Sequence, residues 1–230
     1  MGFERYLKVF AKYKIATLKN DKNEGDFFAF MSLLKDEGLI LDVGANLGIM
    51  TWHLLKNFKK ADIWAFEPIP ENNKILRAVT QEFKSRRYTI YDCALGDKPG
   101  IAKMVLPKVE EVKMQGLSHV VHESINEFNQ GDFYEVPIET LDNLIDNSKK
   151  VKGIKLDVEN FEYFVLKGGE NLIDRDKPII YTELWENENR NKCLDFIRSK
   201  GYSVQVWVNN KLVNFDPALY SGQNFFFIPG

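Results

Sequence analysis

The segment Leu39–Gly48, with the sequence LILDVGANLG, constrains the fold of this chain more than any other. A short apolar run leads into Asp42, a turn containing Gly44 follows, and the residues after Gly48 have the apolar spacing of a helix. A strand, a tight turn and a helix in this order direct backbone N–H groups toward a ligand above the strand. The segment therefore predicts a nucleotide-binding turn in an α/β fold with a mostly parallel sheet.

The two glycines of this turn lack the spacing of a dinucleotide site. Such a site requires G-x-G-x-x-G, whereas Gly44 and Gly48 give G-x-x-x-G. The carboxylate of Asp42, at the carboxyl end of the strand, would also repel a pyrophosphate and attract a cation. S-adenosylmethionine carries an ammonium and a sulfonium group and no phosphate, so the turn favours this ligand. The alternative is that Asp42 only holds the turn in place.

A second acid follows the next predicted strand, residues 62–66. Glu67 lies about 20 residues beyond Gly48, a separation suited to an acid that accepts hydrogen bonds from ribose hydroxyls, and Pro68 then ends the strand. Glu67 supports a nucleoside without distinguishing a dinucleotide from S-adenosylmethionine. A solvated acid at a strand end is the other interpretation.

The composition fits one domain with a short N-terminal addition. With 230 residues, 44% of them hydrophobic, the chain can bury one substantial core. We expect residues 39–230 to form an S-adenosylmethionine-binding domain and residues 1–38 to form a helical segment that packs on it. A net charge of −2 gives no basic excess for binding long nucleic acids.

Cysteine usage and hydropathy suggest a reducing, aqueous compartment. Cys93 and Cys193 are far apart and lack metal-binding or redox spacing, so we expect reduced thiols. No apolar run reaches the ~20 residues that a membrane-spanning helix needs, and no signal-peptide pattern is present. We expect a soluble, cytoplasmic protein.

Residues 3–18 have the spacing of an amphipathic helix. Its apolar face would contain five side chains: Phe3, Leu7, Phe10, Ile15 and Leu18. This face can pack on the flank of the domain or against a second copy of the chain, so a homo-oligomer is one expectation. The lysines elsewhere on the helix leave membrane-surface docking or substrate steering as alternatives.

The third predicted strand, residues 88–91, leads into a loop at the ligand-binding edge of the sheet. This loop, residues 92–97, contains Asp92, Cys93 and Ala94, and adenine would lie against it. The carboxylate of Asp92 can accept a hydrogen bond from the exocyclic amine of adenine, or it can be an ordinary turn acid.

From residue 101 to residue 139 the pattern changes to short strand-like runs joined by polar connectors. We interpret this region, with runs at 101–106, 117–121 and 133–138, as an inserted β-hairpin or lid. It contains His119, a candidate base, although a lone histidine is more often structural.

Charged residues end the predicted strand at 151–158. Alternation along an extended strand would put Lys155, Asp157 and Glu159 on one side. Because strands of parallel sheets are normally apolar on both faces, these charges indicate a wet, functional crevice. A compensated pair of Lys155 with Asp157 is the alternative. Glu183, near the end of the predicted strand 179–184, is a further acid at this edge.

The whole pattern predicts about seven main strands that alternate with helices, which would cover both faces of the sheet. The last strands have no helix between them, so they should form an antiparallel pair.

Several short motifs resemble one family. They are DVGANLG at 42–48 with Thr51 three residues on, FEP at 66–68, ALGD at 94–97, ETLD at 139–142, and IKLDVE at 154–159 followed by FE at 161–162. In this order and spacing they resemble the FkbM-type S-adenosylmethionine-dependent methyltransferases. Asn160 stands where that family usually has glycine, and Trp185 where histidine is common.

The resemblance implies a class I, Rossmann-like methyltransferase fold and methyl transfer to a hydroxyl oxygen, usually of a sugar or a secondary metabolite. Such a transfer needs positioning and a base for the hydroxyl proton. The catalytic or acceptor-binding candidates are Asp157, Glu159, His119 and Glu183. The candidates for binding the cofactor are Asp42, Gly44, Asn46, Gly48, Thr51, Glu67, Pro68, Asp92, Cys93, Ala94 and Asp157.

Other functions and ligands stay open at this point. A magnesium ion held by Asp157 and a neighbouring acid would suit oxygen ligands. A nicotinamide-dependent oxidoreductase would need a pyrophosphate turn, which this sequence lacks. In a noncatalytic cofactor-binding protein, the acids at the strand ends would be solvated surface groups without a catalytic role. The expected partner is a small-molecule or carbohydrate hydroxyl acceptor.

Overall fold

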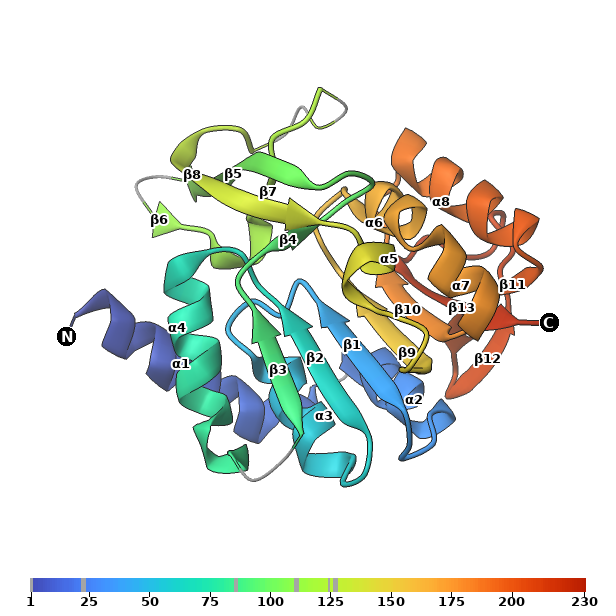
Figure 1. The fold of residues 1–230 in the computed structure, drawn as a ribbon, viewed down its shortest axis with the longest axis horizontal. Helices are drawn as coiled ribbons and strands as arrows, with labels where there is room; N and C mark the ends of the chain where they lie inside the picture. Colours follow the sequence, from blue (N-terminus) through green and yellow to red (C-terminus); the bar gives the residue numbers. More distant parts are fainter. Residues whose placement is uncertain (1, 22–23, 85–86, 110–111, 124, 126–127) are drawn as a thin grey trace.

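The computed structural model describes residues 2–21, 24–84, 87–109, 112–123, 125 and 128–230. Its main sheet has eight strands in the order β12-β11-β13-β10-β9-β1-β2-β3 (Figure 1). Five neighbouring strands are parallel: β1 (Leu39–Val43), β2 (Asp62–Phe66), β3 (Tyr88–Tyr91), β9 (Val151–Leu156) and β10 (Ile179–Glu183). The remaining three are antiparallel: β11 (Tyr202–Val208), β12 (Lys211–Asn214) and β13 (Asn224–Pro229).

The C-terminal strands differ from the prediction of a terminal pair in a seven-stranded sheet. β13 inserts between β10 and β11, and β12 adds an eighth strand at the edge. Asn209 and Asn210, both with positive φ, turn the chain from β11 into β12. Such a two-residue turn matches the twist of a hairpin.

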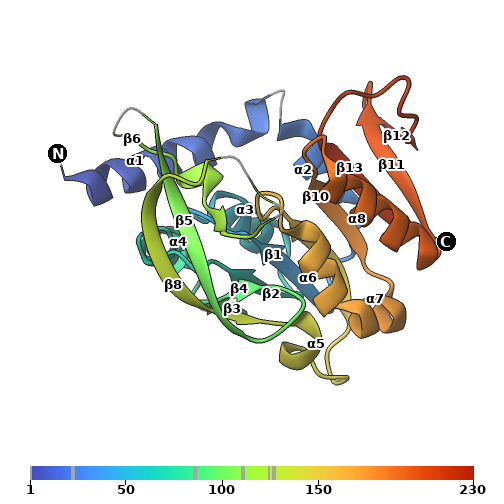
Figure 2. The same ribbon diagram turned by 90° about the horizontal axis from the view of Figure 1, so that it is seen from above.

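Helices cover both faces of the main sheet (Figure 2). Alternation along β1 shows the two layers, because Leu39, Leu41 and Val43 pack in one core cluster and Ile40 in another. One layer contains α1 (Phe3–Thr17), α2 (Gly25–Leu33), α3 (Ile49–Asn57) and α4 (Pro70–Thr80). The other contains α5 (Leu141–Leu144), α6 (Glu162–Gly168), α7 (Glu170–Asp176) and α8 (Glu188–Ser199).

The N-terminal helix packs through fewer residues than its apolar spacing predicts. Leu7 and Ala11 of α1 are buried against a cluster that includes Ile75 of α4. Phe3 is 44% exposed and Phe10 is 38% exposed, so the prediction of a five-residue apolar face was wrong at these two positions.

A second sheet lies over the carboxyl ends of β1, β2 and β3 (Figure 1). Its two long strands, β5 (Gly100–Val109) and β8 (Gly131–Glu139), pair antiparallel within the predicted insertion, but two short strands lie between them in the chain, so they do not form the predicted simple hairpin. Three short strands complete it: β4 (Ala94–Leu95), β6 (Val112–Lys113) and β7 (His119–Val120). The predicted loop 92–97 therefore contains a strand. Parts of the expected connectors, at 110–111, 124 and 126–127, lie outside the described residues.

Candidate functional site

The turn after β1 holds an unusual backbone conformation at three residues. Gly44 has φ +77°, Asn46 +49° and Gly48 +80°. A β-carbon on Gly48 would lie 2.5 Å from a side-chain carbon of Leu76, so this glycine allows α3 and α4 to pack closely. We conclude that Gly48 shapes the turn, whereas Gly44 and Asn46 line the space above it.

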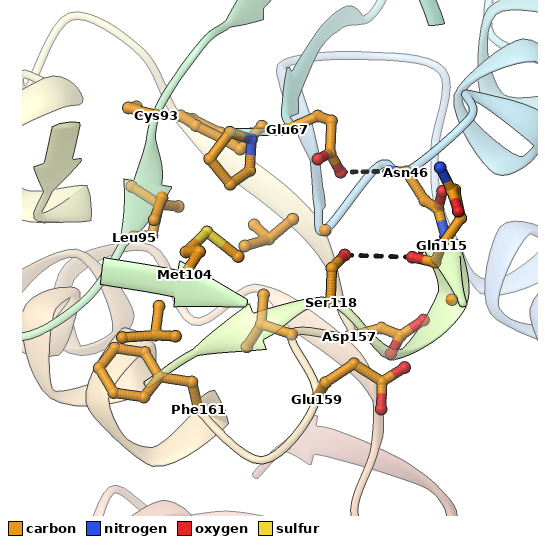
Figure 3. A pocket seen from close by; sticks show the side chains of 18 residues that line it. Asn46, Glu67, Cys93, Leu95, Met104, Gln115, Ser118, Asp157, Glu159 and Phe161 are labelled. Atoms are coloured by element: carbon orange, nitrogen blue, oxygen red, sulfur yellow. Dashed lines mark hydrogen bonds between the residues drawn. The ribbon is translucent and has the colours of Figure 1, made fainter. Parts of the chain in front are cut away.

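That space, the first cavity, encloses about 560 Å³ when the part open to solvent is included. One of its ends is apolar and the other carries carboxylates, as Figure 3 shows. Its lining includes Val43, Gly44, Asn46, Phe66, Glu67, Pro68, Cys93, Ala94, Leu95, Met104, Gln115, Gly116, Ser118, Val120, Asp157, Val158, Glu159 and Phe161.

Glu67 is the most enclosed acid on the wall of this cavity, with 3% of its surface exposed. One carboxylate oxygen accepts a hydrogen bond from the backbone N–H of Asn46 at 2.8 Å (Figure 3). The other accepts from the N–H of Ile69 at 2.8 Å. Burial raises the pKa of Glu67 to about 7 although these bonds oppose the shift. The turn and the acid are thus joined directly, and both line the first cavity.

Asp42 and Thr51 lie beneath the turn and line none of the three cavities of the site, so their contact with a ligand stays a prediction. Both are fully buried, and the hydroxyl of Thr51 donates to the Asp42 carboxylate at 2.5 Å. The other carboxylate oxygen of Asp42 lies 3.6 Å from the ammonium of Lys155. Asp42 therefore anchors the turn, and Lys155 compensates its charge.

Lys155 also contacts two groups at the end of β9. Its ammonium donates to the carbonyl of Gly44 at 2.9 Å and lies 3.3 Å from the Asp157 carboxylate. The predicted pair of Lys155 with Asp157 is confirmed. Burial alone would lower the pKa of Lys155, but Asp157 and Asp42 raise it above its ordinary value.

The alternation expected for Lys155, Asp157 and Glu159 does not hold. β9 ends at Leu156, and Glu159 and Asn160 have φ of +54° and +73°. The chain leaves the strand direction there, and Glu159 lines the first cavity from the loop that follows β9. A left-handed conformation suits glycine or asparagine, which accounts for Asn160 at the usual glycine position of the motif.

A second cavity, of about 790 Å³, opens at the ends of β9 and β10. Glu183 and Asp157 both line it, so the structure brings these predicted residues together. Its full lining is Glu24, Met50, Lys155, Asp157, Tyr181, Glu183, Gln223 and Asn224.

A connecting cavity of about 760 Å³ shares residues with both of these spaces. It has Gly44, Asn46 and Asp157 in common with the first cavity, and Glu24 and Asp157 in common with the second. Asp157 lines all three, so it stands where they meet. Phe10 and Lys14 of α1 also line the connecting cavity.

The carboxyl groups around Asp157 hold protons more tightly than isolated acids do. Burial, and next the charge of Asp157, raise the pKa of Glu183 to about 7. The same two causes raise the pKa of Glu159, and burial raises that of Glu24. Carboxylates that share a poorly solvated space disfavour one another's charge. Such perturbed groups in a cleft are typical of functional sites.

The loop after β3 places its residues on different sides. Cys93 and Ala94 line the apolar end of the first cavity, as predicted. Asp92 is turned outward, where it accepts from Asn73 at 2.8 Å and pairs with Arg77. Its predicted contact with a base is not supported by this geometry, which favours the turn-acid alternative.

His119 is buried in the second sheet and does not line the first cavity. One ring nitrogen lies 2.9 Å from the carbonyl of Leu117, and the other lies 3.1 Å from the side-chain oxygen of Asn129. Because both nitrogens have partners within the insertion, the structure assigns His119 a structural place and not that of a base.

Sequence reasoning did not single out several residues that line these cavities, among them Glu24, Gln115 and Tyr181. Gln115 is 8% exposed, and both polar atoms of its side-chain amide lack hydrogen-bond partners among the described residues. It lines the first and the connecting cavity. No motif marks these residues, and only the fold brings them to the edge of the sheet.

Within the described ranges, no group of three or more histidine, cysteine, aspartate or glutamate side chains has metal-binding geometry. Among those residues there is also no helix long and apolar enough to cross a membrane.

The family model and a curated relative indicate the same class of protein. The family model described as "Methyltransferase FkbM domain" matches residues 42–204. A curated relative named Methyltransferase 1, from Beauveria bassiana, is 23% identical over 192 residues, which cover 74% of each chain.

Two solved structures share the fold. A methyltransferase FkbM from Methylobacillus flagellatus superposes with a TM-score of 0.58 at 19% identity, over 85% of this chain and 45% of its own. An rRNA methylase from Streptococcus thermophilus superposes with a TM-score of 0.51 at 9% identity, over 90% and 94%. The chain thus spans less than half the length of the former protein.

Proposed function

The chain belongs to the FkbM methyltransferase family, and we propose that it transfers a methyl group from S-adenosylmethionine to a hydroxyl oxygen of a small molecule or carbohydrate. The observation that carries the proposal is the run of three cavities that meet at Asp157. They provide room for a donor and an acceptor on either side of one carboxylate.

The residues of the first cavity fit an adenosine. Cys93, Ala94 and Leu95 form an apolar wall suited to a flat base, and Glu67 can accept hydrogen bonds from ribose hydroxyls. The buried side-chain oxygen of Asn46 and the amide of Gln115 have no partners in the described part of the chain, so they can bond a polar ligand without losing other contacts. Bound here, S-adenosylmethionine supplies a methyl group on a positively charged sulfur.

The connecting cavity suits the amino-acid end of the same ligand. Asp157 offers a carboxylate to an ammonium, and Lys14 of α1 offers a cation to a carboxylate. Lys14 is held by Asp21 at 3.2 Å, which fixes its position. In this proposal the segment 1–38 completes the donor site.

Glu183 is the candidate for the base. It lines the second cavity beside Asp157, and its raised pKa of about 7 suits a group that takes a proton near neutral pH. The hydroxyl proton would pass to the Glu183 carboxylate while the oxygen takes the methyl group. Positioning of the two reactants supplies much of the rate in such a displacement.

Membership of the family excludes a nicotinamide-dependent oxidoreductase as the leading alternative. The remaining alternative is a noncatalytic protein that binds the cofactor, and a measurement of methyl transfer distinguishes it from the proposed enzyme. Neither the cytoplasmic location nor a homo-oligomer through α1 is needed for this proposal, and both remain predictions.

Incubation of the protein with isotopically labelled S-adenosylmethionine and a panel of sugars and hydroxylated metabolites tests the proposal. We expect label in a methyl ether, and loss of transfer in Glu183→Gln. Glu186→Gln removes an exposed acid that lines none of the three cavities, and it should retain transfer. Binding of the donor without transfer to any hydroxyl would contradict the proposal.

A further inference from the structure

We propose that the second cavity binds an acceptor that carries a protonated amino group in addition to the hydroxyl that receives the methyl group. The inference rests on the proposed function and assigns the chemical class of its acceptor.

The first argument is the balance of charge around the second cavity. Three carboxylates line it, those of Glu24, Asp157 and Glu183, and its single cation is Lys155. The ammonium of Lys155 already lies within 4 Å of Asp42 as well as Asp157. No hydrogen bond or ion pair joins Glu24 or Glu183 to a cation among the described residues.

The donor ligand does not remove this imbalance. S-adenosylmethionine carries two positive charges and one negative charge, so its net contribution is one positive charge. Asp157, where the cavities meet, would be its nearest carboxylate. No cation of the described residues then lies within ion-pair distance of Glu24 or Glu183, although Lys155 acts on both carboxylates from farther away. Burial of unpaired carboxylates is unfavourable, and a cation in the cavity relieves it.

The second argument is independent of charge and concerns Tyr181. Its side chain is 5% exposed and lines the second cavity. Its hydroxyl has no hydrogen-bond partner in the part of the chain that the structure describes. The hydroxyl faces the cavity with its hydrogen-bonding capacity unused, so it can bond a polar group of a ligand there.

The register of the sheet fixes this arrangement. Lys155 pairs with Asp42 on one side and with Tyr181 on the other, so the three side chains form a row on one face. Glu183 lies two residues beyond Tyr181 and points to the same face. The hydroxyl and the carboxylate therefore flank one space, where an amine and a neighbouring hydroxyl can both bind.

The test compares amines with their neutral derivatives. Binding of glucosamine, 2-deoxystreptamine and kanamycin to the full chain, saturated with S-adenosylhomocysteine, is measured by calorimetry against the N-acetylated form of each. At least one amine should bind about tenfold or more tighter than its acetylated form, as for a charge-assisted hydrogen bond. No preference for any amine would overturn the inference.

Variants locate the binding. Glu183→Gln and Tyr181→Phe should each lower the affinity for the preferred amine about tenfold or more. Both variants should keep the affinity for S-adenosylhomocysteine within about twofold of the wild type. Glu186→Gln is the matched control for loss of an acid and should bind as the wild type. Unchanged amine affinity in both cavity variants would refute the assignment.

Two further outcomes separate the possible failures. If S-adenosylhomocysteine itself does not bind, the proposed function fails. If it binds and Mg²⁺ alone, tested as a separate ligand, saturates the cavity and displaces the amine, the acidic cavity is a metal site and only this inference fails.

Discussion

The backbone carbonyl oxygen of Asp157 lies 1.8 Å from the position that a β-carbon on Gly44 would occupy. Two parallel strands thus approach so closely at their carboxyl ends that only glycine fits between them. This contact places the donor-binding turn of β1 against the acid that lines all three cavities.

Gly44→Ala should therefore destabilise the protein severely. The added methyl group meets a backbone atom that cannot rotate away, and φ of +77° is itself unfavourable for alanine. We expect a loss of about 3 kcal/mol or more in the free energy of unfolding, measured in urea.

Gly201→Ala is the matched control for Gly44→Ala. Gly201 has a similar φ of +76°, but a β-carbon there would meet nothing within 4 Å. Its cost should be only that of the backbone conformation, about 1–2 kcal/mol. Equal losses in the two variants would show that the contact with Asp157 does not matter.

Lys155→Met should leave the fully buried carboxylate of Asp42 and the partly exposed carboxylate of Asp157 without their cation. Removal of one partner from a buried ion pair typically costs about 3–5 kcal/mol. Since the pKa of Lys155 is raised, the wild-type protein keeps this stabilisation below the ordinary lysine pKa of about 10.4 and loses it only at higher pH. Urea unfolding at pH 7 measures the loss, and a loss below about 1 kcal/mol, the value of an exposed ion pair, would argue against the pairing.

Glu183→Gln should lower kcat without abolishing donor binding. Loss of a general base typically reduces the rate by about 10²- to 10⁴-fold. In the wild-type protein kcat/KM should rise with pH through about 7, because only the ionised carboxylate accepts the proton. The variant should lose this rise. A rise that persists in Glu183→Gln would assign the base to another group.

Gln115→Ala should weaken binding of the methyl donor without lowering the stability of the fold. The amide of Gln115 is buried without partners among the described residues, so its removal leaves no bond broken in the free protein. We expect affinity for S-adenosylhomocysteine to fall about 3- to 10-fold, the value of one neutral hydrogen bond, while the unfolding free energy stays equal or rises. Gln130→Ala, at an exposed position of the same insertion, should change neither quantity. Lost stability with unchanged affinity would mark Gln115 as structural.

Local patterns predicted the elements of the fold well. The strand, turn and helix at residues 39–57 follow from spacing and turn chemistry alone. Gly168 and Gly169 signal the end of α6, so spacing gives no sign of α7, which begins directly at Glu170. Spacing also could not show that β13 inserts between β10 and β11, since strand order depends on contacts distant in sequence.

In the site, too, the residues that depend on contacts distant in sequence could not be predicted. Glu67 and Asp157 were predictable because acids at strand ends must gather at one edge of a parallel sheet. The burial of Asp42 was not, because it depends on Thr51 one helical turn into α3 and on Lys155 in another strand. Glu24 and Gln115 come from segments without a motif, and packing alone brings them to the cavities.

A crystal structure of the protein with S-adenosylhomocysteine tests the central claim most directly. The account predicts the ribose hydroxyls within about 3 Å of the Glu67 carboxylate, the adenine against Cys93 to Leu95, and the sulfur beside Asp157. A ligand bound away from Glu67, or an adenine outside the first cavity, would contradict it.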